Sequence, residues 1–143
     1  MSFPPLVKYE SEAEYRKHYI ETYCVTPVTT FDGYRVIFAR ARFDHAFYIS
    51  TQRNEVKDDF SKDRAERIDW IKYALENPSS DLRVGWDKVR KRYDPNYRVA
   101  IIMGNYIVVI SISSKERKEA FFVTAYLADN NALVKIVRSP KWK

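Results

Sequence analysis

The sequence predicts an α+β fold in which N-terminal helices pack on a mainly antiparallel, four-stranded β-meander. Three observations predict it. Apolar residues recur at helical spacing in the first half of the chain, and they recur at every second position after Pro78. The turns between the expected strands are short, which favours antiparallel neighbours. At 143 residues the chain fits one domain with its own core, so we expect a single domain over 1–143.

The first part, 1–33, is expected to hold a helix and a strand. Ser11 and Glu14 form the pair of a capping box, which marks a helix start. Three tyrosines then recur every fourth residue on one helical face: Tyr15, Tyr19 and Tyr23. A β-like stretch follows at 24–30, and Asp32 with Gly33 gives the turn signal of a hairpin.

The larger part, 34–143, begins with a predicted strand at 34–43. Successive side chains of this strand point to opposite faces, and Ile37, Ala39, Ala41 and Phe43 share one of them. Residues 44–50 are expected to form a short helix or loop that holds His45. A charged loop at 51–60 leads to the next helix.

That next helix has the clearest pattern in the chain. Ser61 is a suitable N-cap, and Asn77 followed by Pro78 ends the helix. The apolar stripe between them consists of Ile68, Ile71 and Leu75. We therefore expect one helix from Ser61 to Asn77, with this stripe against the core.

The meander follows in the last half of the chain. Strands are predicted at 86–93, 98–103, 106–113 and 121–127. The turns that join them are predicted at 94–96, 104–105 and 114–119.

The charge and aromatic content of the chain indicate which class of molecule it could bind. The net charge is +6 and 15% of the residues are aromatic, a balance that favours nucleic acid or another polyanion. A net charge of about 2–8 is also common on small soluble domains. Only 3 glycines are present, which argues against a Gly-rich phosphate loop.

Cysteine count and hydropathy bear on location. Cys24 is the only cysteine, so an intrachain disulfide and a cysteine-based zinc site are excluded. Residues 1–7 lack the basic start and apolar stretch of a signal peptide, and no apolar run approaches the ~20 residues of a membrane span. We expect a cytoplasmic protein that makes no membrane contact.

A basic cluster between 83 and 98 is the first candidate binding region. Six cations, Arg83, Lys88, Arg90, Lys91, Arg92 and Arg98, are interleaved with Trp86, Tyr93 and Tyr97. Cations with aromatic rings suit single-stranded RNA, in which bases stack and phosphates need charge. The alternative is a solvated edge strand. The predicted nucleic-acid surface comprises Arg40, Arg42, Trp86, Lys88, Arg90, Arg92, Tyr93 and Arg98.

A second candidate is a pair of arginines at the start of the clearest helix. Arg64 and Arg67 lie three residues apart, a spacing at which two guanidinium groups can clamp one phosphate. Arg64 shares the face of the apolar stripe, where an arginine needs a partner. The alternative is an ion pair with a neighbouring carboxylate, either Asp63, Asp59 or Asp58.

His45 and the last strand supply proton-transfer and hydroxyl groups. Histidine titrates near neutral pH, and nearby arginines favour its neutral form, which can act as a base. Thr124 and Tyr126 project from one face of the strand and can orient a phosphate or a water. The alternatives are a hydrogen-bonded histidine at the core edge and a sheet face that simply packs. His18 is expected on the surface.

Metal and cofactor chemistry is not predicted. The only clustered carboxylates, Asp58, Asp59 and Asp63, are interpreted as a solvated group. No Walker loop, nucleophile elbow or zinc spacing is present.

Three segments resemble small bacterial and phage-associated nucleases. They are 40–47 (Arg-Ala-Arg-Phe-Asp-His-Ala-Phe), 57–67 and 122–126 (Phe-Val-Thr-Ala-Tyr). They are similar to the barnase, EndoU, colicin and RelE-like (BECR) superfamily, and the resemblance covers about 34–140. It implies a helical N-terminal part on a four-stranded antiparallel sheet. It also implies cleavage of RNA without a metal, often by a toxin.

The resemblance assigns roles to matching positions. It implies catalytic roles for His45, Arg64, Thr124 and Tyr126, with Lys57 and Arg67 as accessories. The chain lacks an obvious glutamate on the meander to act as general base, so His45 takes that role. Expected partners are RNA, such as tRNA or mRNA, and an acidic antitoxin or immunity protein.

The expected function is therefore a metal-independent endoribonuclease. The 2′-hydroxyl attacks the adjacent phosphorus, His45 takes its proton, and Arg64 and Arg67 stabilise the growing charge. Lys57 assists the leaving oxygen. The alternative is a module that binds nucleic acid without cleaving it.

Overall fold

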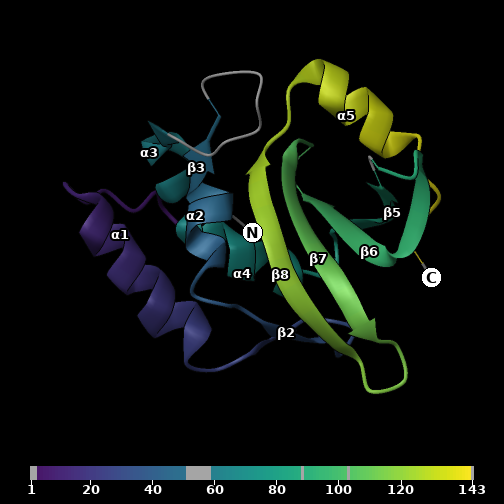
Figure 1. Ribbon diagram of the computed structural model, residues 1–143, viewed down its shortest axis with the longest axis horizontal. Helices are drawn as coiled ribbons and strands as arrows, with labels where there is room; N and C mark the ends of the chain where they lie inside the picture. Colours follow the sequence, from purple (N-terminus) through teal and green to yellow (C-terminus); the bar gives the residue numbers. More distant parts are fainter. Residues whose placement is uncertain (1–2, 51–58, 88, 103, 143) are drawn as a thin grey trace.

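A six-stranded sheet forms the centre of the protein, and helices flank it (Figure 1). The computed structural model describes residues 3–50, 59–87, 89–102 and 104–142. Lys57 and Lys88 of the predicted site lie outside the described residues. The fold is α+β with a mainly antiparallel sheet, as the sequence predicts.

The helices lie mostly in the first half of the chain. They are α1 (Glu12–Tyr19), the π-helical turn η1 (Ile20–Cys24), α2 (Arg42–Phe47), α3 (Lys62–Ala65), α4 (Ile68–Glu76) and α5 (Asn130–Val137). No helix in the described part of the chain has both the length and the apolar character that crossing a membrane requires.

The main sheet has six strands, so the predicted number of four is wrong. In spatial order they are β1 (Val28–Thr29), β2 (Arg35–Ile37), β8 (Glu119–Leu127), β7 (Tyr106–Ser114), β6 (Arg92–Ile102) and β5 (Asp81–Asp87). Strands β5 to β8 form the antiparallel meander. Strand β2 adds to it in parallel beside β8, with Val36 opposite Ala120. A separate pair joins β3 (Tyr48–Ile49) to β4 (Asp59–Phe60).

The N-terminal helix begins as predicted but runs further. The Ser11 side chain accepts from the Glu14 N–H, and the Glu14 carboxylate accepts in return from the Ser11 N–H. The helix continues through η1 to Cys24, so the predicted strand at 24–30 is reduced to β1. Burial of Tyr19 and Tyr23 explains the extension, because η1 keeps Tyr23 on the buried face.

The predicted strand at 34–43 is wrong beyond Ile37, where β2 ends. Tyr34, Val36 and Phe38 are buried, whereas Ile37 is exposed. Aromatic rings bury more apolar surface than alanines do, and Phe38 stacks on Phe122 with 4.7 Å between the ring centroids. After Phe38 the chain enters α2. This short helix contains His45, as predicted.

The helix predicted from Ser61 is confirmed at both ends but is divided. The Ser61 hydroxyl accepts from the Arg64 N–H at 3.2 Å. A turn at Glu66 and Arg67 separates α3 from α4, which ends before Asn77. The apolar stripe is buried as predicted: Ile68, Ile71 and Leu75.

The β5–β6 hairpin turns earlier than predicted. Strand β5 ends at Asp87 and β6 begins at Arg92. The turn signal at 94–96 instead makes an irregularity inside β6, where Gly85 pairs with Asp94 and Val84 with Arg98. The Asp94 carboxylate accepts from the Asn96 N–H at 2.9 Å, which stabilises this local turn within the strand.

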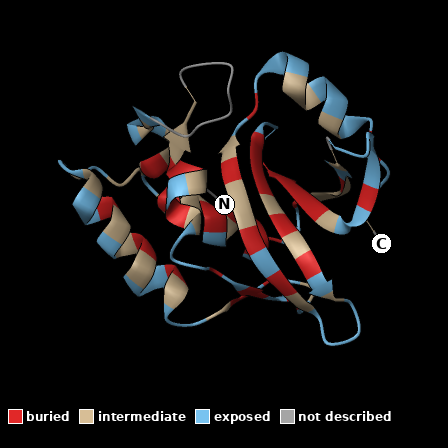
Figure 2. Cartoon of the chain, in the orientation of Figure 1, coloured by how far each residue is buried: buried red, intermediate tan, exposed pale blue. Residues whose placement is uncertain are grey.

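Two apolar cores lie on the two faces of the sheet. Consecutive residues at the start of β7 are buried, as expected for a strand covered on both faces, and Figure 2 shows buried residues along the central strands. Along β7, Tyr106 and Val108 belong to the larger core with α1 to α4, whereas Ile107 belongs to the smaller one. Helix α5, which the sequence did not predict, packs Leu133 and Ile136 against that smaller core.

Candidate active site

Arg64 is the centre of the candidate active site. Its backbone is held by the Ser61 cap at the start of α3. Its side chain is half-buried and Nη1 donates to the Ala46 carbonyl in α2 at 3.3 Å. The guanidinium carbon lies 5.4 Å from the ring centroid of Tyr126 in β8. Arg64 thus joins α2, α3 and β8.

The charge of Arg64 is not compensated by a carboxylate in the part of the chain that the structure describes. Among the described residues, no Asp or Glu forms an ion pair with this guanidinium. Burial lowers the pKa of Arg64, and Tyr126 and Tyr106 oppose that shift. Partial burial of a cation without a counter-charge is costly. An anion bound here would therefore gain a strong electrostatic partner.

Tyr126 presents a neutral phenol beside this cation. Burial raises the pKa of Tyr126, although Arg64 acts in the opposite direction. Within the described parts of the chain its hydroxyl has no hydrogen-bond partner. The register pairs Ile107 with Tyr126 and Val109 with Thr124, so Thr124 and Tyr126 face the same side of β8, as predicted.

His45 lies in α2, next in sequence to the residue that Arg64 contacts. Its side chain is half-buried, and its neighbour Ala46 supplies the carbonyl that accepts from Arg64. The structure thus brings Arg64 against Tyr126 and against the helix that carries His45.

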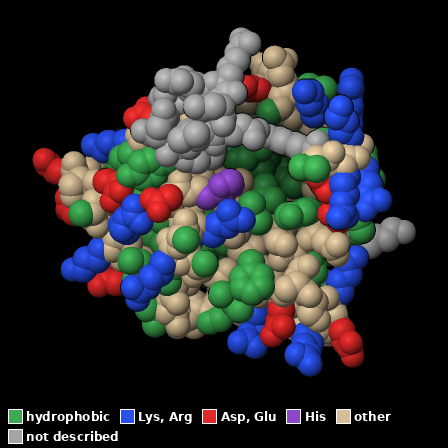
Figure 3. Space-filling model, in the orientation of Figure 1, with side chains coloured by type: hydrophobic (Ala, Val, Ile, Leu, Met, Phe, Trp, Pro, Cys, Tyr) green, Lys and Arg blue, Asp and Glu red, His purple; other side chains and the backbone are tan. Residues whose placement is uncertain are grey.

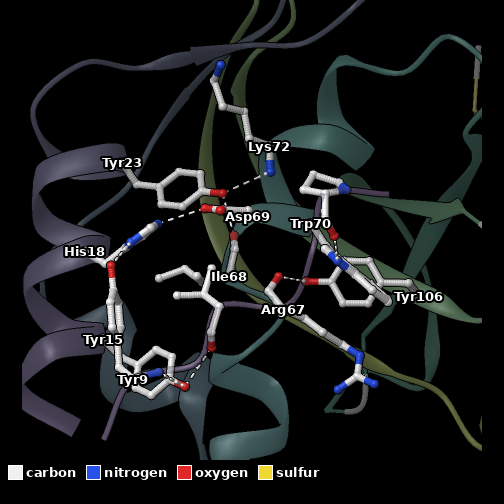
Figure 4. Close-up of polar contacts among 12 residues, drawn as sticks. Tyr9, Tyr15, His18, Tyr23, Arg67, Ile68, Asp69, Trp70, Lys72 and Tyr106 are labelled. Carbon is white, nitrogen blue, oxygen red and sulfur yellow. Dashed lines mark hydrogen bonds and ion pairs between the residues drawn. The ribbon is translucent and has the colours of Figure 1, made fainter. Parts of the chain in front are cut away.

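Arg67, the other arginine of the predicted phosphate clamp, has partners of its own. Its Nη1 lies 2.8 Å from the Asp63 carboxylate, and its guanidinium carbon lies 5.0 Å from the Trp70 ring centroid. The structural ion pair left open by the sequence is therefore the one observed for Arg67. Figure 4 shows its guanidinium turned away from the contacts of His18 and Asp69.

No family model, curated protein or solved structure matches this chain. The chemistry of the site is accordingly inferred from its own residues. Within the described ranges, no three His, Cys, Asp or Glu side chains gather as a metal site would require. Metal independence stays a prediction.

The predicted nucleic-acid surface is accessible at the β5–β6 hairpin. Trp86 and Tyr93 are 52% and 38% exposed, and their rings meet edge to face at 5.0 Å. Arg90 and Arg92 are also exposed. Figure 3 shows Lys and Arg side chains at the right-hand edge, where Figure 1 places β5 and β6. Arg40, before α2, is exposed, and Arg42, within it, is half-buried.

Arg98 is a correction to that surface. Only 1% of it is exposed, and it forms an ion pair with Asp32 at 2.7 Å. The regular register between β6 and β7 accounts for its direction, because Arg98 pairs with Ile110, a residue of the larger core. Arg98 is therefore a structural cation.

His18, expected on the surface, is half-buried between two helices. Its Nδ1 lies 2.9 Å from the Tyr9 hydroxyl and its Nε2 lies 2.8 Å from the Asp69 carboxylate (Figure 4). The contact links the N-terminal segment and α1 to α4. The sequence could have predicted this burial, since His18 follows Tyr15 by three residues and so shares the buried face of the helix.

Proposed function

We propose that this protein cleaves RNA without a metal, through attack of a 2′-hydroxyl on the adjacent phosphorus. The observation that carries the proposal is Arg64, a half-buried cation with no ion-pair partner among the described residues, held over Tyr126. In this reaction negative charge grows on the phosphate oxygens. A preorganised guanidinium in a partly desolvated site stabilises such charge.

Each group has a distinct role in the proposed reaction. His45 accepts the proton of the attacking 2′-hydroxyl, and the oxygen forms a bond to phosphorus as the 5′-oxygen leaves. The products are a 2′,3′-cyclic phosphate and a 5′-hydroxyl. Arg64 stabilises the equatorial oxygens, and the Tyr126 phenol donates to one of them. We assign charge stabilisation to Arg64 and not to Arg67, which has Asp63 as its partner.

The remaining assignments complete this proposal. Thr124, on the same side of β8, orients the phosphate, and Lys57 gives a proton to the leaving oxygen. The substrate is RNA, such as tRNA or mRNA. An acidic antitoxin or immunity protein would neutralise a basic nuclease of this kind and is part of the same proposal.

A second candidate function is RNA binding without cleavage. It is favoured by the exposed Trp86–Tyr93 pair, which stands beside the cations of the β5–β6 hairpin. Aromatic rings among cations bind single strands with no need for His45.

The decisive experiment is an RNA cleavage assay in the presence of a metal chelator. We expect wild-type protein to yield fragments with 2′,3′-cyclic phosphate ends. Arg64→Gln is expected to slow cleavage by at least about 100-fold, and His45→Ala by about 100- to 10,000-fold. Arg117→Gln, a change of an exposed arginine in the β7–β8 loop, serves as the matched control.

The outcomes separate the two candidates. Cleavage that survives both Arg64→Gln and His45→Ala would refute these assignments. Intact RNA recovered from a salt-sensitive complex with the wild-type protein would establish the binding module instead. Thermal unfolding of each variant confirms that it is folded under the assay conditions.

A further inference from the structure

An aromatic groove lies on the sheet face that α5 partly covers, and it adjoins the candidate active site through Tyr126. Its volume is about 900 Å³, bounded by strands β5 to β8 and by α5. Its floor is apolar, with Val99, Ile107 and Val109. The aromatic side chains that line it are Trp86, Tyr93, Tyr97 and Tyr126. The hollow lined by hydrophobic side chains near the centre of Figure 3 agrees with a recessed apolar surface.

The polar tips of these aromatic residues are available to a ligand. In the described ranges, the hydroxyls of Tyr93, Tyr97 and Tyr126 and the indole N–H of Trp86 make no hydrogen bond. Trp86 and Tyr93 are exposed, and the hydroxyls of Tyr97 and Tyr126 are not among the buried side-chain atoms that lack a partner. Four rings with accessible donors suit a ligand that has both flat faces and polar edges.

The backbone is adapted to admit one of these rings. A Cβ at Gly85 would lie 2.5 Å from the Cβ of Tyr97, a distance that side chains do not tolerate. Glycine at this position thus allows β5 to approach β6 where the register shifts between Val84 and Gly85. Tyr97 lines the groove beside this close approach.

Charged groups of both signs stand at the groove's margin. Lys135 in α5 and Arg138 directly after it are exposed, and neither forms an ion pair with any described residue. Asp87 and Asp129 also line the groove. Free cations suit phosphates, and carboxylates accept hydrogen bonds from the amino groups of bases.

We propose that the aromatic groove holds unstacked bases of single-stranded RNA that flank the phosphate contacted by Arg64. This inference rests on the proposed function, because it takes the ligand of Arg64 to be RNA. Bases in an A-form duplex are stacked and paired, and their faces are not free to contact aromatic rings. The substrate class is therefore single-stranded RNA or an unpaired loop, and duplex RNA is a poor ligand.

Binding of an RNA that cannot react tests the groove separately from cleavage. The probe is a fluorescein-labelled 12-nucleotide RNA of mixed sequence with 2′-O-methyl groups throughout, since these block the attacking hydroxyl. It is titrated with the full chain, alone and annealed to its complement. We expect the single strand to bind at least about tenfold more tightly than the duplex.

Substitutions locate the binding to the groove. Trp86→Ala and Tyr97→Ala are each expected to weaken single-strand binding by about 5- to 150-fold, which corresponds to about 1–3 kcal/mol for loss of one stacked base. Phe121→Ala is the matched control, because Phe121 is a 45% exposed aromatic residue of β8 outside the groove lining. We expect it to bind as wild type does.

Failure of the groove and failure of the proposed function give different results. Equal affinity for duplex and single strand, or wild-type binding by Trp86→Ala and Tyr97→Ala, overturns the groove inference even if RNA is cleaved. If binding depends on the groove but unmodified RNA is not cleaved, the proposed nuclease activity is refuted and the groove inference still holds. If Tyr97→Ala does not fold, the test depends on Trp86→Ala, because Trp86 is exposed and its replacement should leave the fold intact.

Discussion

Arg98 and Asp32 form a two-pronged ion pair beneath the first hairpin. Nη1 and Nη2 of Arg98 lie 2.7 and 3.0 Å from the two carboxylate oxygens of Asp32. The rings of Tyr34 and Trp142 lie within 5.4 and 5.9 Å of the guanidinium carbon. The pair therefore joins β6 to the turn before β2 and to the C-terminal segment.

We predict that Asp32→Asn lowers the free energy of unfolding by about 3 kcal/mol. Removing one partner of a buried pair costs about 3–5 kcal/mol because the other charge stays buried, and 29% exposure of the Asp32 side chain reduces that value. Urea denaturation measures it. Glu76→Gln, in the exposed pair with Lys72, is the control and should change stability by less than about 0.5 kcal/mol. Equal effects of the two changes would contradict the prediction.

The same pair predicts a specific pH dependence. Burial by itself would raise the pKa of Asp32, but hydrogen bonds from Arg98 and Thr30 outweigh it, and the pKa is lowered from 3.8. A carboxyl with a lowered folded-state pKa contributes stability above its unfolded-state pKa and loses it as pH falls through the folded-state pKa.

The difference in unfolding free energy between wild type and Asp32→Asn should therefore be constant from about pH 7 to pH 5 and shrink below about pH 4. Urea denaturation at successive pH values measures this difference, from which other titrating groups cancel. A difference that grew toward acid pH would show that the folded-state pKa is raised instead.

Ser61→Ala is predicted to lower stability by about 1 kcal/mol, because α3 loses the hydroxyl that accepts from the Arg64 N–H. The change also loosens the segment that holds Arg64, so cleavage should fall by more than the population of unfolded protein explains. Ser113→Ala, at an exposed position of β7, is the control. Unchanged cleavage and stability would mean that this cap does not position Arg64.

Arg92→Gln is predicted to weaken RNA binding and to reduce its salt dependence. Each phosphate contact with a single strand contributes about 0.7 to the slope of log affinity against log salt. Exposed Arg92, at the start of β6, should account for one contact. Titration of the 2′-O-methyl RNA at several salt concentrations measures the slope, and Arg117→Gln should leave it unchanged. A slope unaffected by Arg92→Gln would remove this residue from the binding surface.

Much of the local structure could be predicted from the sequence. The starts of α1 and α3 were correct because Ser11 and Ser61 bond to backbone groups three residues away. The last two strands of the meander were also located, since their alternation and the loop between them are local signals. The Asp94 turn was recognised as a turn, but its place inside β6 depends on pairing with β5.

The candidate site was predictable as residue types and not as geometry. His45, Arg64, Thr124 and Tyr126 were selected from the sequence, and whether they act together stays a prediction. Arg67 and Arg98 look equally available in sequence. Asp63, the partner of Arg67, is four residues away and was an alternative in the sequence. Only the fold gives Arg98 its carboxylate partner and leaves Arg64 without one among the described residues.

The sequence by itself determined the fold class and the points where helices begin, because those features depend on hydrogen bonds and periodicity within a few residues. Tertiary structure alone decided which face of 34–38 is buried, where α5 packs and that Arg98 is neutralised by a distant carboxylate. Arg98 meets a carboxylate 66 positions away, and Arg64 meets a ring in the last strand. Burial and Coulomb attraction act between residues that are close in space, so only the packed chain settles them.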